Sequence, residues 1–397
     1  MPGRRTLPAA LLGAALLGAT AAAEWSGFVA VEARGFFHAP LDPDQHGANL
    51  SLAAEPEFTH RWDDGRHSFR FVPFLRWDQH DDARSHADIR ELGWVVAAQA
   101  WELRAGVRKV FWGVTESQHL VDVINQTDLV ENLDGEDKLG QPMINLALIH
   151  DWGTVDLYAL AGFRERSFPG REGRLRSHPP VDTGLSQFES SRGRGRIDAA
   201  IRWRRSIGAF DIGLAHFHGT ARDPRLVPGL DDLGRPVLIP HYDIIDQSSL
   251  DLQATLGQWL WKLETISRRQ QGERFTAATA GFEYTLVGVL AGSADLGLLA
   301  EYVYDDRGTR APTPFQDDLF LGLRLALNDV QSTELLAGVI GDREFDTRFY
   351  NLEASRRIGD HWKIALELRA LSGAPAADPF FSLRRDDTLQ IELARYF

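Results

Sequence analysis

The sequence contains no cysteine and only two methionines among its 397 residues. In an exported chain, the absence of cysteine excludes a disulfide scaffold and thiol chemistry. Beyond the N-terminal segment, no apolar run reaches the roughly 18 residues that a membrane-spanning helix requires. A basic excess is also lacking, because 43 Lys and Arg stand against 56 Asp and Glu. Nucleic acid is therefore not an expected partner.

The N-terminus has the pattern of a secretory signal peptide. Arg4 and Arg5 are followed by an apolar run, and a small-residue A-x-A cleavage site ends at Ala23. We predict a signal peptide over 1–23 and a mature chain over 24–397, exported through the general secretory pathway. The arginine pair also permits a twin-arginine signal, but the three residues after it fit that motif poorly.

The dominant pattern in the mature chain is alternation with a period of two. Residues 362–369 read WKIALELR, so three large apolar side chains follow Trp362 on one face and Lys, Ala, Glu and Arg occupy the other. Successive side chains of a strand point to opposite faces of the sheet. The same alternation recurs in segments of about ten residues, which is the length of a tilted strand that crosses a bilayer. Strands of soluble β-sandwiches average only about 5–6 residues.

This pattern predicts an all-β fold, an antiparallel transmembrane β-barrel of about 18 strands, with 16 as the alternative. Long and short connections alternate along most of the chain, as expected when outer loops and inner turns alternate. No linker divides residues 24–397, so a single barrel domain is expected. The expected strands cover roughly 25–37, 49–62, 67–78, 87–98, 101–111, 142–150, 154–164, 194–206, 209–220, 245–257, 259–269, 274–286, 294–305, 317–327, 332–342, 347–358, 361–371 and 385–397.

Aromatic residues provide an independent check on this assignment, because amphipathic rings concentrate at the two surfaces of a bilayer. One predicted girdle lies near the inner turns and consists of Trp62, Trp101, Trp152, Trp203, Trp259 and Trp362. The candidates for the outer girdle are Phe36, Phe37, Trp77, Phe111, Trp112, Phe163, Tyr302 and Tyr304. The alternative is that these rings form the core of a soluble β protein.

The chain ends in LQIELARYF, with a terminal Phe397 preceded by alternating apolar residues. This resembles the last strand of Gram-negative outer-membrane β-barrels of the porin-like kind, although Arg395 stands where an apolar residue is usual. The resemblance implies residence in the cell outer membrane. It also implies contact with outer-membrane lipid and recognition of the final strand, with Phe397 as its signal, by the barrel-assembly machinery. A shorter segment, RKVFWG from Arg108, is similar to the end of a strand in alginate-export-like barrels.

The interior of such a wide barrel is expected to carry charge, because side chains alone cannot fill it. The inward-facing basic residues of the first half form a predicted basic wall: Arg70, Arg76, Arg104, Arg108, Arg196, Arg202 and Arg204. The second half mixes both signs. These charges are expected to line a pore and select solutes. Equally, they are expected to pair across strands and hold the strand register.

Residues 112–141 form the longest connection, the third on the outer side. The segment is acidic and also contains an apolar thread from Val114 to Val130, which a solvated loop would not need. By position and length it resembles the third loop of porins, which folds inward and narrows the channel. We expect its acidic residues Glu116, Asp122 and Asp128 to face the basic wall. A loop that covers the rim of the barrel remains the alternative.

The preferred function is passive diffusion of small hydrophilic solutes, with anions or saccharides as candidate preferred solutes. Neither a catalytic residue nor a cofactor is expected. The alternatives are an outer-membrane hydrolase and a barrel with an assembly or adhesion role. The residues weighed for a catalytic triad are Ser117, His119 and Asp122, which lack a G-x-S-x-G context.

Metal binding is weighed at two places and is not expected at either. The first is an acidic and histidine-containing cluster at an outer loop, formed by Asp78, His80, Asp81, Asp82 and His86. The second is the pair His216 and His218 on one strand face, which has no third ligand.

Overall fold

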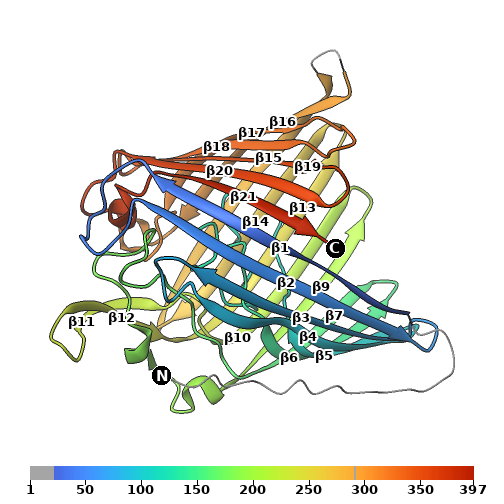
Figure 1. Cartoon of the computed structure of the whole chain (residues 1–397). Helices are drawn as coiled ribbons and strands as arrows, with labels where there is room; N and C mark the ends of the chain where they lie inside the picture. Colours follow the sequence, from blue (N-terminus) through green and yellow to red (C-terminus); the bar gives the residue numbers. More distant parts are fainter. Residues whose placement is uncertain (1–21, 290–291) are drawn as a thin grey trace, which may run out of the picture.

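The computed structural model describes residues 22–289 and 292–397 of the chain. Most of the predicted signal peptide, residues 1–21, lies outside the described residues. Eighteen strands form one sheet, in which every neighbouring pair is antiparallel (Figure 1). Among the described residues, no helix is both long and apolar enough to cross a membrane.

The strands of the barrel are β1 (Ala22–Phe36), β2 (Ala48–Trp62), β3 (His67–Asp78), β4 (His86–Ala97), β5 (Trp101–Arg108), β6 (Gln141–His150), β7 (Gly153–Ala161), β9 (Ile197–Ile207), β10 (Phe210–Thr220), β13 (Ile244–Leu256), β14 (Trp259–Gln270), β15 (Glu273–Val289), β16 (Ala294–Asp305), β17 (Asp317–Ala326), β18 (Glu334–Asp342), β19 (Arg348–Ile358), β20 (Trp362–Ser372) and β21 (Thr388–Tyr396).

The sheet closes because the first strand pairs with the last. β1 hydrogen-bonds to β2 on one side and to β21 on the other, with Phe28 opposite Tyr396 and Phe36 opposite Thr388. Beyond β21, the backbone N–H of Phe397 donates to the carbonyl oxygen of Gly27 at 3.1 Å. The predicted 18-stranded barrel is confirmed, and the 16-stranded alternative is wrong.

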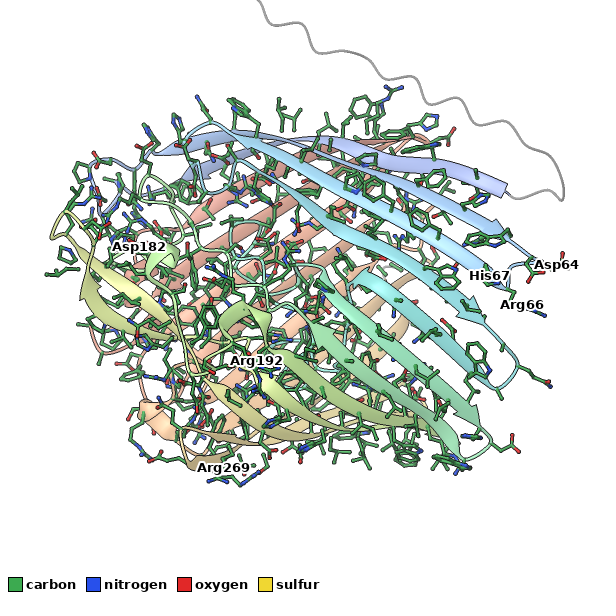
Figure 2. All side chains as sticks on the ribbon, turned by 90° about the horizontal axis from the view of Figure 1, so that it is seen from below. Asp64, Arg66, His67, Asp182, Arg192 and Arg269 are labelled. Atoms are coloured by element: carbon green, nitrogen blue, oxygen red, sulfur yellow. The ribbon has the colours of Figure 1, made fainter. Side chains whose placement is uncertain are left out.

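The alternation read from the sequence corresponds to the two faces of the barrel wall. In β9, Ile197 and Ile201 on the outer face are 61% and 45% exposed, whereas Asp198 on the inner face is 2% exposed. In β14, Trp261 on the outside is 46% exposed and Glu264 on the inside is fully buried. Side chains therefore cover both sides of the ribbon (Figure 2), with apolar groups outside and charged groups inside. This is the distribution of a barrel surrounded by lipid.

The connections divide the barrel into two ends. Short turns join strands at one end, which we call the short-turn end, where Figure 2 shows Asp64 and Arg66 beside the turn between β2 and β3. The opposite, long-loop end carries the connections between β5 and β6 and between β7 and β9, and Asp182 lies there.

A second, three-stranded sheet at the long-loop end was not predicted from the sequence. It consists of β8 (Gln187–Phe188), β11 (Arg225–Leu230) and β12 (Pro236–Tyr242), where we expected only irregular loops. The hairpin between β11 and β12 turns at Asp231, whose carboxylate accepts hydrogen bonds from the N–H groups of Leu233 and Arg235. Two apolar runs that flank such a turn are a hairpin signal, but their prolines weaken the strand pattern.

The inner aromatic girdle matches the strand ends. Trp101, Trp259 and Trp362 begin β5, β14 and β20 at the short-turn end, and all three are exposed. Two of the outer candidates were wrongly assigned, because Trp112 and Phe163 are only 3% and 5% exposed and lie inside the barrel. Both residues follow the ends of shorter strands than predicted, so their rings turn inward with the loops. The outer candidates Phe37, Trp77, Phe111, Tyr302 and Tyr304 are exposed.

Candidate functional site

Most of the connection between β5 and β6 packs against the inside of the barrel wall. We call residues 112–141, which include the first residue of β6, the inner loop. Its apolar thread is buried, with Val121 and Ile124 fully inaccessible and Trp112 and Val123 nearly so. These side chains form one cluster with inward-facing residues of seven strands, namely Met143, Tyr158, Leu160, Ala200, Phe217, Ile245, Ile266, Phe275 and Ala277. Each such large apolar side chain stabilises the packed state by about 1.5–3 kcal/mol when it is fully buried.

Glu264 of β14 holds the first part of the inner loop. Its Oε1 accepts hydrogen bonds from the N–H of Val114 at 2.7 Å and from the N–H and hydroxyl of Thr115 at 3.1 and 2.7 Å. Its Oε2 accepts from the N–H of Val121 at 3.1 Å. The loop approaches so closely that a side chain at Gly113, where φ is +144°, would lie 2.9 Å from Oε1 of Glu264.

Glu301 of β16 holds the next residues in the same way. It accepts hydrogen bonds from the N–H groups of Glu116 and Ser117, both at 2.8 Å, and from the Ser117 hydroxyl at 2.6 Å. The carboxylate of Glu116 in turn lies 2.6 Å from the guanidinium of Arg324 on β17. Hydrogen bonds to ionised groups are the stronger kind, so two buried carboxylates fix this stretch of backbone.

His119 links the two halves of the inner loop. Its Nε2 lies 2.6 Å from Oε1 of Glu136, and its Nδ1 lies 3.9 Å from Oε1 of Glu264. Burial by itself lowers the pKa of His119, but the two carboxylates outweigh that effect and raise the pKa to about 10. The same contact lowers the pKa of Glu136. His119 is therefore a cation at neutral pH and compensates part of the acidic charge around it.

The second part of the inner loop reaches strands far from β14 and β16. Arg369 of β20 contacts Asp134 at 3.0 Å and hydrogen-bonds to Asn132. Arg34 of β1 donates to the carbonyl oxygen of Glu131 at 2.9 Å. Because the loop contacts β14, β16, β17, β20 and β1, it extends across the interior rather than along the rim.

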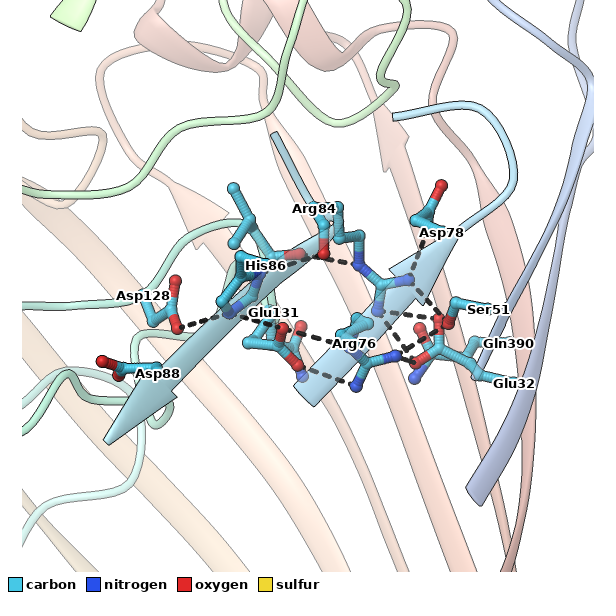
Figure 3. A network of polar contacts seen from close by, with 12 residues as sticks. Glu32, Ser51, Arg76, Asp78, Arg84, His86, Asp88, Asp128, Glu131 and Gln390 are labelled. Carbon is cyan, nitrogen blue, oxygen red and sulfur yellow. Dashed lines mark hydrogen bonds and ion pairs between the residues drawn. The ribbon is translucent and has the colours of Figure 1, made fainter. Parts of the chain in front are cut away.

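A network of ion pairs fixes the loop beside β1, β3 and β4 (Figure 3). Arg76 bridges Glu32 at 3.2 Å and Glu131 at 2.7 Å. Arg84 also pairs with Glu32, at 2.9 Å, and donates to the carbonyl oxygen of Val130 at 2.8 Å. Buried charges of both signs thus satisfy one another, as burial requires.

Three residues of this network have the spacing of metal ligands: His86, Asp128 and Glu131 offer ligand atoms within 4.8 Å of one another. The ring Nδ1 of His86 lies 2.9 Å from the carbonyl oxygen of Arg84, so Nε2 faces the two carboxylates. Both carboxylates are already paired, Asp128 with Arg90 at 2.6 Å and Glu131 with Arg76. The sequence did not suggest this grouping, because Asp128 and Glu131 come from a distant loop.

The metal clusters weighed from the sequence do not form ligand groups. Asp78 pairs with Arg84 at 2.8 Å and accepts the N–H groups of His80 and Asp81. Asp81 accepts the N–H of Gly170, and the ring of His80 stacks on His46. His216 and His218 both lie near Asp246, at 3.3 and 3.8 Å. Among the described residues, neither set gathers three ligand atoms.

The candidate catalytic triad is not assembled either. The Ser117 hydroxyl donates to Glu301, and His119 contacts Glu136 and Glu264. Asp122 pairs with Lys138 at 3.1 Å. Each member therefore has a different partner, and the described contacts contain no nucleophile–base pair among the three.

The seven arginines of the basic wall share strand faces with buried interior residues, but they do not face the acidic loop residues as a set. Most pair with carboxylates on the wall of the barrel, no more than two strands away: Arg70 with Glu57, Arg104 with Asp156, Arg196 with Asp198, Arg202 with Asp251 and Arg204 with Asp156. Two of them contact the inner loop with their side chains: Arg76 pairs with Glu131, and the guanidinium of Arg202 lies 4.9 Å from the ring centre of Trp112. Arg108 has no ion-pair partner among the described residues, and its Nη1 is buried.

The loop's own acidic residues find other partners than expected. Glu116 pairs with Arg324 and lies 3.6 Å from Lys262, Asp122 pairs with Lys138, and Asp128 pairs with Arg90. The expectation that they oppose Arg104, Arg108 and Arg202 is wrong. Sequence alternation places a charge on the inner face, but it does not reveal which strand lies opposite.

A cavity of about 1310 Å³ lies between the inner loop and the wall formed by β14 to β21. Its lining extends from Arg307 at the long-loop end along β17 to Ala326, and along β20 to Lys363 at the short-turn end. Glu116 and Asp122 line it, whereas Asp128 does not. None of the seven predicted arginines is among the described residues that line it.

Solved structures share this architecture. The Pseudomonas aeruginosa proteins OpdO and OccK11 each align over 94% of this chain with a TM-score of 0.55 and 10% identity, covering 96% and 95% of their own lengths. The fold is porin-like. A mutant of the Rh. blastica porin aligns over 95% of this chain and 100% of its own, with 10% identity and a TM-score of 0.46. No family model and no curated protein matches the sequence of this porin-like barrel.

Proposed function

We propose that the porin-like barrel resides in the outer membrane and conducts small hydrophilic solutes by passive diffusion. The observation that carries the proposal is the cavity between the inner loop and β14 to β21, whose lining extends from one end of the barrel to the other. A water-filled passage with charged walls sets a size limit and an electrostatic preference. The apolar outer face supports a lipid environment.

The inner loop, residues 112–141, is the proposed constriction of this passage. Support comes from the two buried carboxylates of β14 and β16 that hold its backbone and from its contact with Arg76 of β3 across the barrel. Glu116 and Asp122 lie on its cavity side, and Asp128 anchors its other side. The arginines Arg70, Arg104, Arg108, Arg196, Arg202 and Arg204 are proposed to line the part of the barrel interior that lies outside this cavity.

The two terminal segments of the chain are the basis for a proposal about its export and assembly. We propose that residues 1–23 direct the chain through the general secretory pathway and that Phe397 contributes to recognition by the barrel-assembly machinery. The pairing of β1 with β21 supports a role for the last strand, since this contact closes the barrel. The preference for anions or saccharides expected from the basic wall has little support, because most of its arginines are ion-paired and lie away from the cavity.

Planar-bilayer recording of the refolded chain without residues 1–23 tests the proposal. Wild-type protein should form steady channels, and deletion of residues 116–136 should raise the single-channel conductance. Deletion of residues 230–236, the tip of the hairpin between β11 and β12, removes no residue that lines the cavity; it serves as the matched control and should leave the conductance unchanged. A folded wild-type barrel without conductance would refute the channel, and turnover of an ester or phospholipid substrate would favour the hydrolase alternative. A folded loop deletion with unaltered conductance would refute the constriction.

A further inference from the structure

Three phenylalanine rings meet at the long-loop end of the cavity. Phe349 lies near the start of β19, Phe315 lies in the connection between β16 and β17, and Phe380 lies in the short 3-10 helix η4 (Pro379–Leu383) between β20 and β21. All three residues line the cavity. The ring of Phe380 stacks on that of Phe349, with centres 5.5 Å apart, and meets the ring of Phe315 edge-on at 5.7 Å. We call these three residues the aromatic cluster.

The barrel wall extends the apolar surface of the aromatic cluster. Phe349 lies opposite Ile340 of β18, and Ile340 lies opposite Phe320 of β17, so the three residues form one row across neighbouring strands. Ile340 and Phe320 also line the cavity. Two glycines make room for the Phe320 ring, since a methyl group added at Gly322 or Gly338 would lie 2.7 or 2.5 Å from its carbons. The wall is therefore shaped to hold a ring at this place.

The rings of the aromatic cluster are not enclosed in a core. Phe315, Phe349 and Phe380 are each half-buried, and none of them belongs to the hydrophobic clusters of the described residues. Each ring therefore keeps part of its surface toward the cavity. Sites that bind small molecules are lined mainly by apolar and aromatic side chains, with a few polar groups that orient the ligand.

Charge, by comparison, gives the cavity no clear preference for one sign. Its described lining contains ten carboxylates and nine Lys or Arg side chains, with His119 as a further cation. Several of these groups pair with one another, as Glu116 does with Arg324 at 2.6 Å and Asp134 with Arg369 at 3.0 Å. Among solutes of equal net charge, the apolar part of the solute is therefore what the aromatic cluster can distinguish.

We infer that the aromatic cluster binds the ring of hydrophilic solutes that carry an aromatic group, and that the passage prefers them over solutes of equal charge without a ring. This inference rests on the proposed channel function and names the substrate class of the same passage. Offset or edge-to-face contact between rings favours binding by about two- to tenfold beyond the burial of apolar area. Such a gain enriches a solute at the mouth of the passage without trapping it there.

Block of the KCl current in planar bilayers tests the inference with two pairs of probes. L-Phenylalanine and L-glutamine carry the same charged groups, whereas phenyl β-D-glucoside and methyl β-D-glucoside are both uncharged. In the wild type, the probe with the ring should block at an about tenfold lower concentration than its partner. The triple variant F315L/F349L/F380L keeps apolar side chains without rings and should lower this ratio about fivefold.

Two further variants complete the experiment. F37L removes an exposed ring outside the cavity and is the matched control, with no change expected. Heat-modifiable mobility on gels verifies that each variant is folded. If the triple variant does not fold, F380L alone removes the ring that contacts the other two and should lower the ratio about twofold.

The outcomes separate the inference from the channel function. If the wild type conducts ions but the two members of each pair block it equally, the inference is wrong while the channel function stands. If the folded variants keep the wild-type ratio, the three rings only hold the loops of the mouth together, and the inference is again wrong. If the folded wild type conducts no ions, the proposed function itself fails.

Discussion

Replacing Glu264 with glutamine should release the first part of the inner loop from the barrel wall. The carboxylate of Glu264 is fully buried and accepts four hydrogen bonds, from Val114, Thr115 and Val121. Glutamine keeps the size of the side chain, but it loses the charge and replaces one acceptor oxygen with a donor NH₂ group. That group would face either the N–H of Val121 or the donors of Val114 and Thr115, so the donors on that side lose their acceptor and meet another donor.

The magnitude follows from the number and kind of bonds lost. Hydrogen bonds to charged groups contribute about 1.5–3 kcal/mol each, and the bonds at one carboxylate are not additive. We therefore expect the loop to lose about 3 kcal/mol of local stability. Since each 1.4 kcal/mol is a factor of ten, the open population of this segment should rise by about 100-fold. The barrel itself should remain closed, because backbone pairing between its eighteen strands is retained in the variant.

Hydrogen–deuterium exchange of the detergent-solubilised barrel measures this opening. The amides of Val114 and Val121 should exchange about 100-fold faster in E264Q. The amides of Glu116 and Ser117 should change less, because Glu301 still accepts their hydrogen bonds. E273Q is the control, because Glu273 is exposed and does not line the cavity. Unchanged exchange at Val114 and Val121 in a folded E264Q barrel would refute the anchoring role of this carboxylate, and noisier single-channel currents would support its link to the constriction.

Three further outcomes are expected. The pKa of His119 is raised to about 10, so the stability that its charge gives the loop should be complete below about pH 6.5 and be lost as the pH rises through 10. Hydrogen–deuterium exchange at Val121 between pH 7 and 11 measures this loss. H119Q should abolish the pH dependence of the loop's stability. Trp112→Ala should lower the packing stability of the inner loop by about 3–5 kcal/mol and make the loop more susceptible to protease. Trp152 is exposed, so Trp152→Ala is the control. Equal resistance of the two variants to protease would contradict the role of the Trp112 ring in holding the loop. Deletion of Phe397 should slow assembly in cells more than refolding in detergent, as followed by heat-modifiable mobility, and equal effects in both settings would remove its role as an assembly signal.

The strands of the barrel were predictable because each carries its own signal. A transmembrane strand alternates between lipid and interior, so Ile197 and Asp198 reveal their faces without knowledge of any neighbour. The small sheet of β8, β11 and β12 has no such environment, and its prolines obscure the pattern. The predicted ends of β5 and β7, at 111 and 164, were each three residues too late. The chain turns into the interior after Arg108 and Ala161, so Trp112 and Phe163, predicted as girdle residues, are buried.

The candidate site was predictable only in part, for a related reason. The apolar thread of residues 112–141 indicated packing, and Val121 and Ile124 are indeed buried. Its partners could not be inferred, since Glu264 and Glu301 lie about 150 and 185 positions away from the loop residues that they hold. A glutamate on the inner face of a strand looks the same in the sequence whether it faces water, an arginine or a loop backbone.

The anchoring of the inner loop by Glu264 and Glu301 also makes the loop a check on how the barrel is put together. Side chains alternate strictly along a strand, so a slip of one residue in the pairing of β14 would turn Glu264 from the interior toward lipid. The same slip would turn the neighbouring Trp261 inward and leave the donors of Val114 and Val121 without an acceptor. A misaligned barrel would thus carry a charge in hydrocarbon and lose the contacts of the inner loop at the same time, so correct strand alignment is coupled to the docking of the loop inside the barrel.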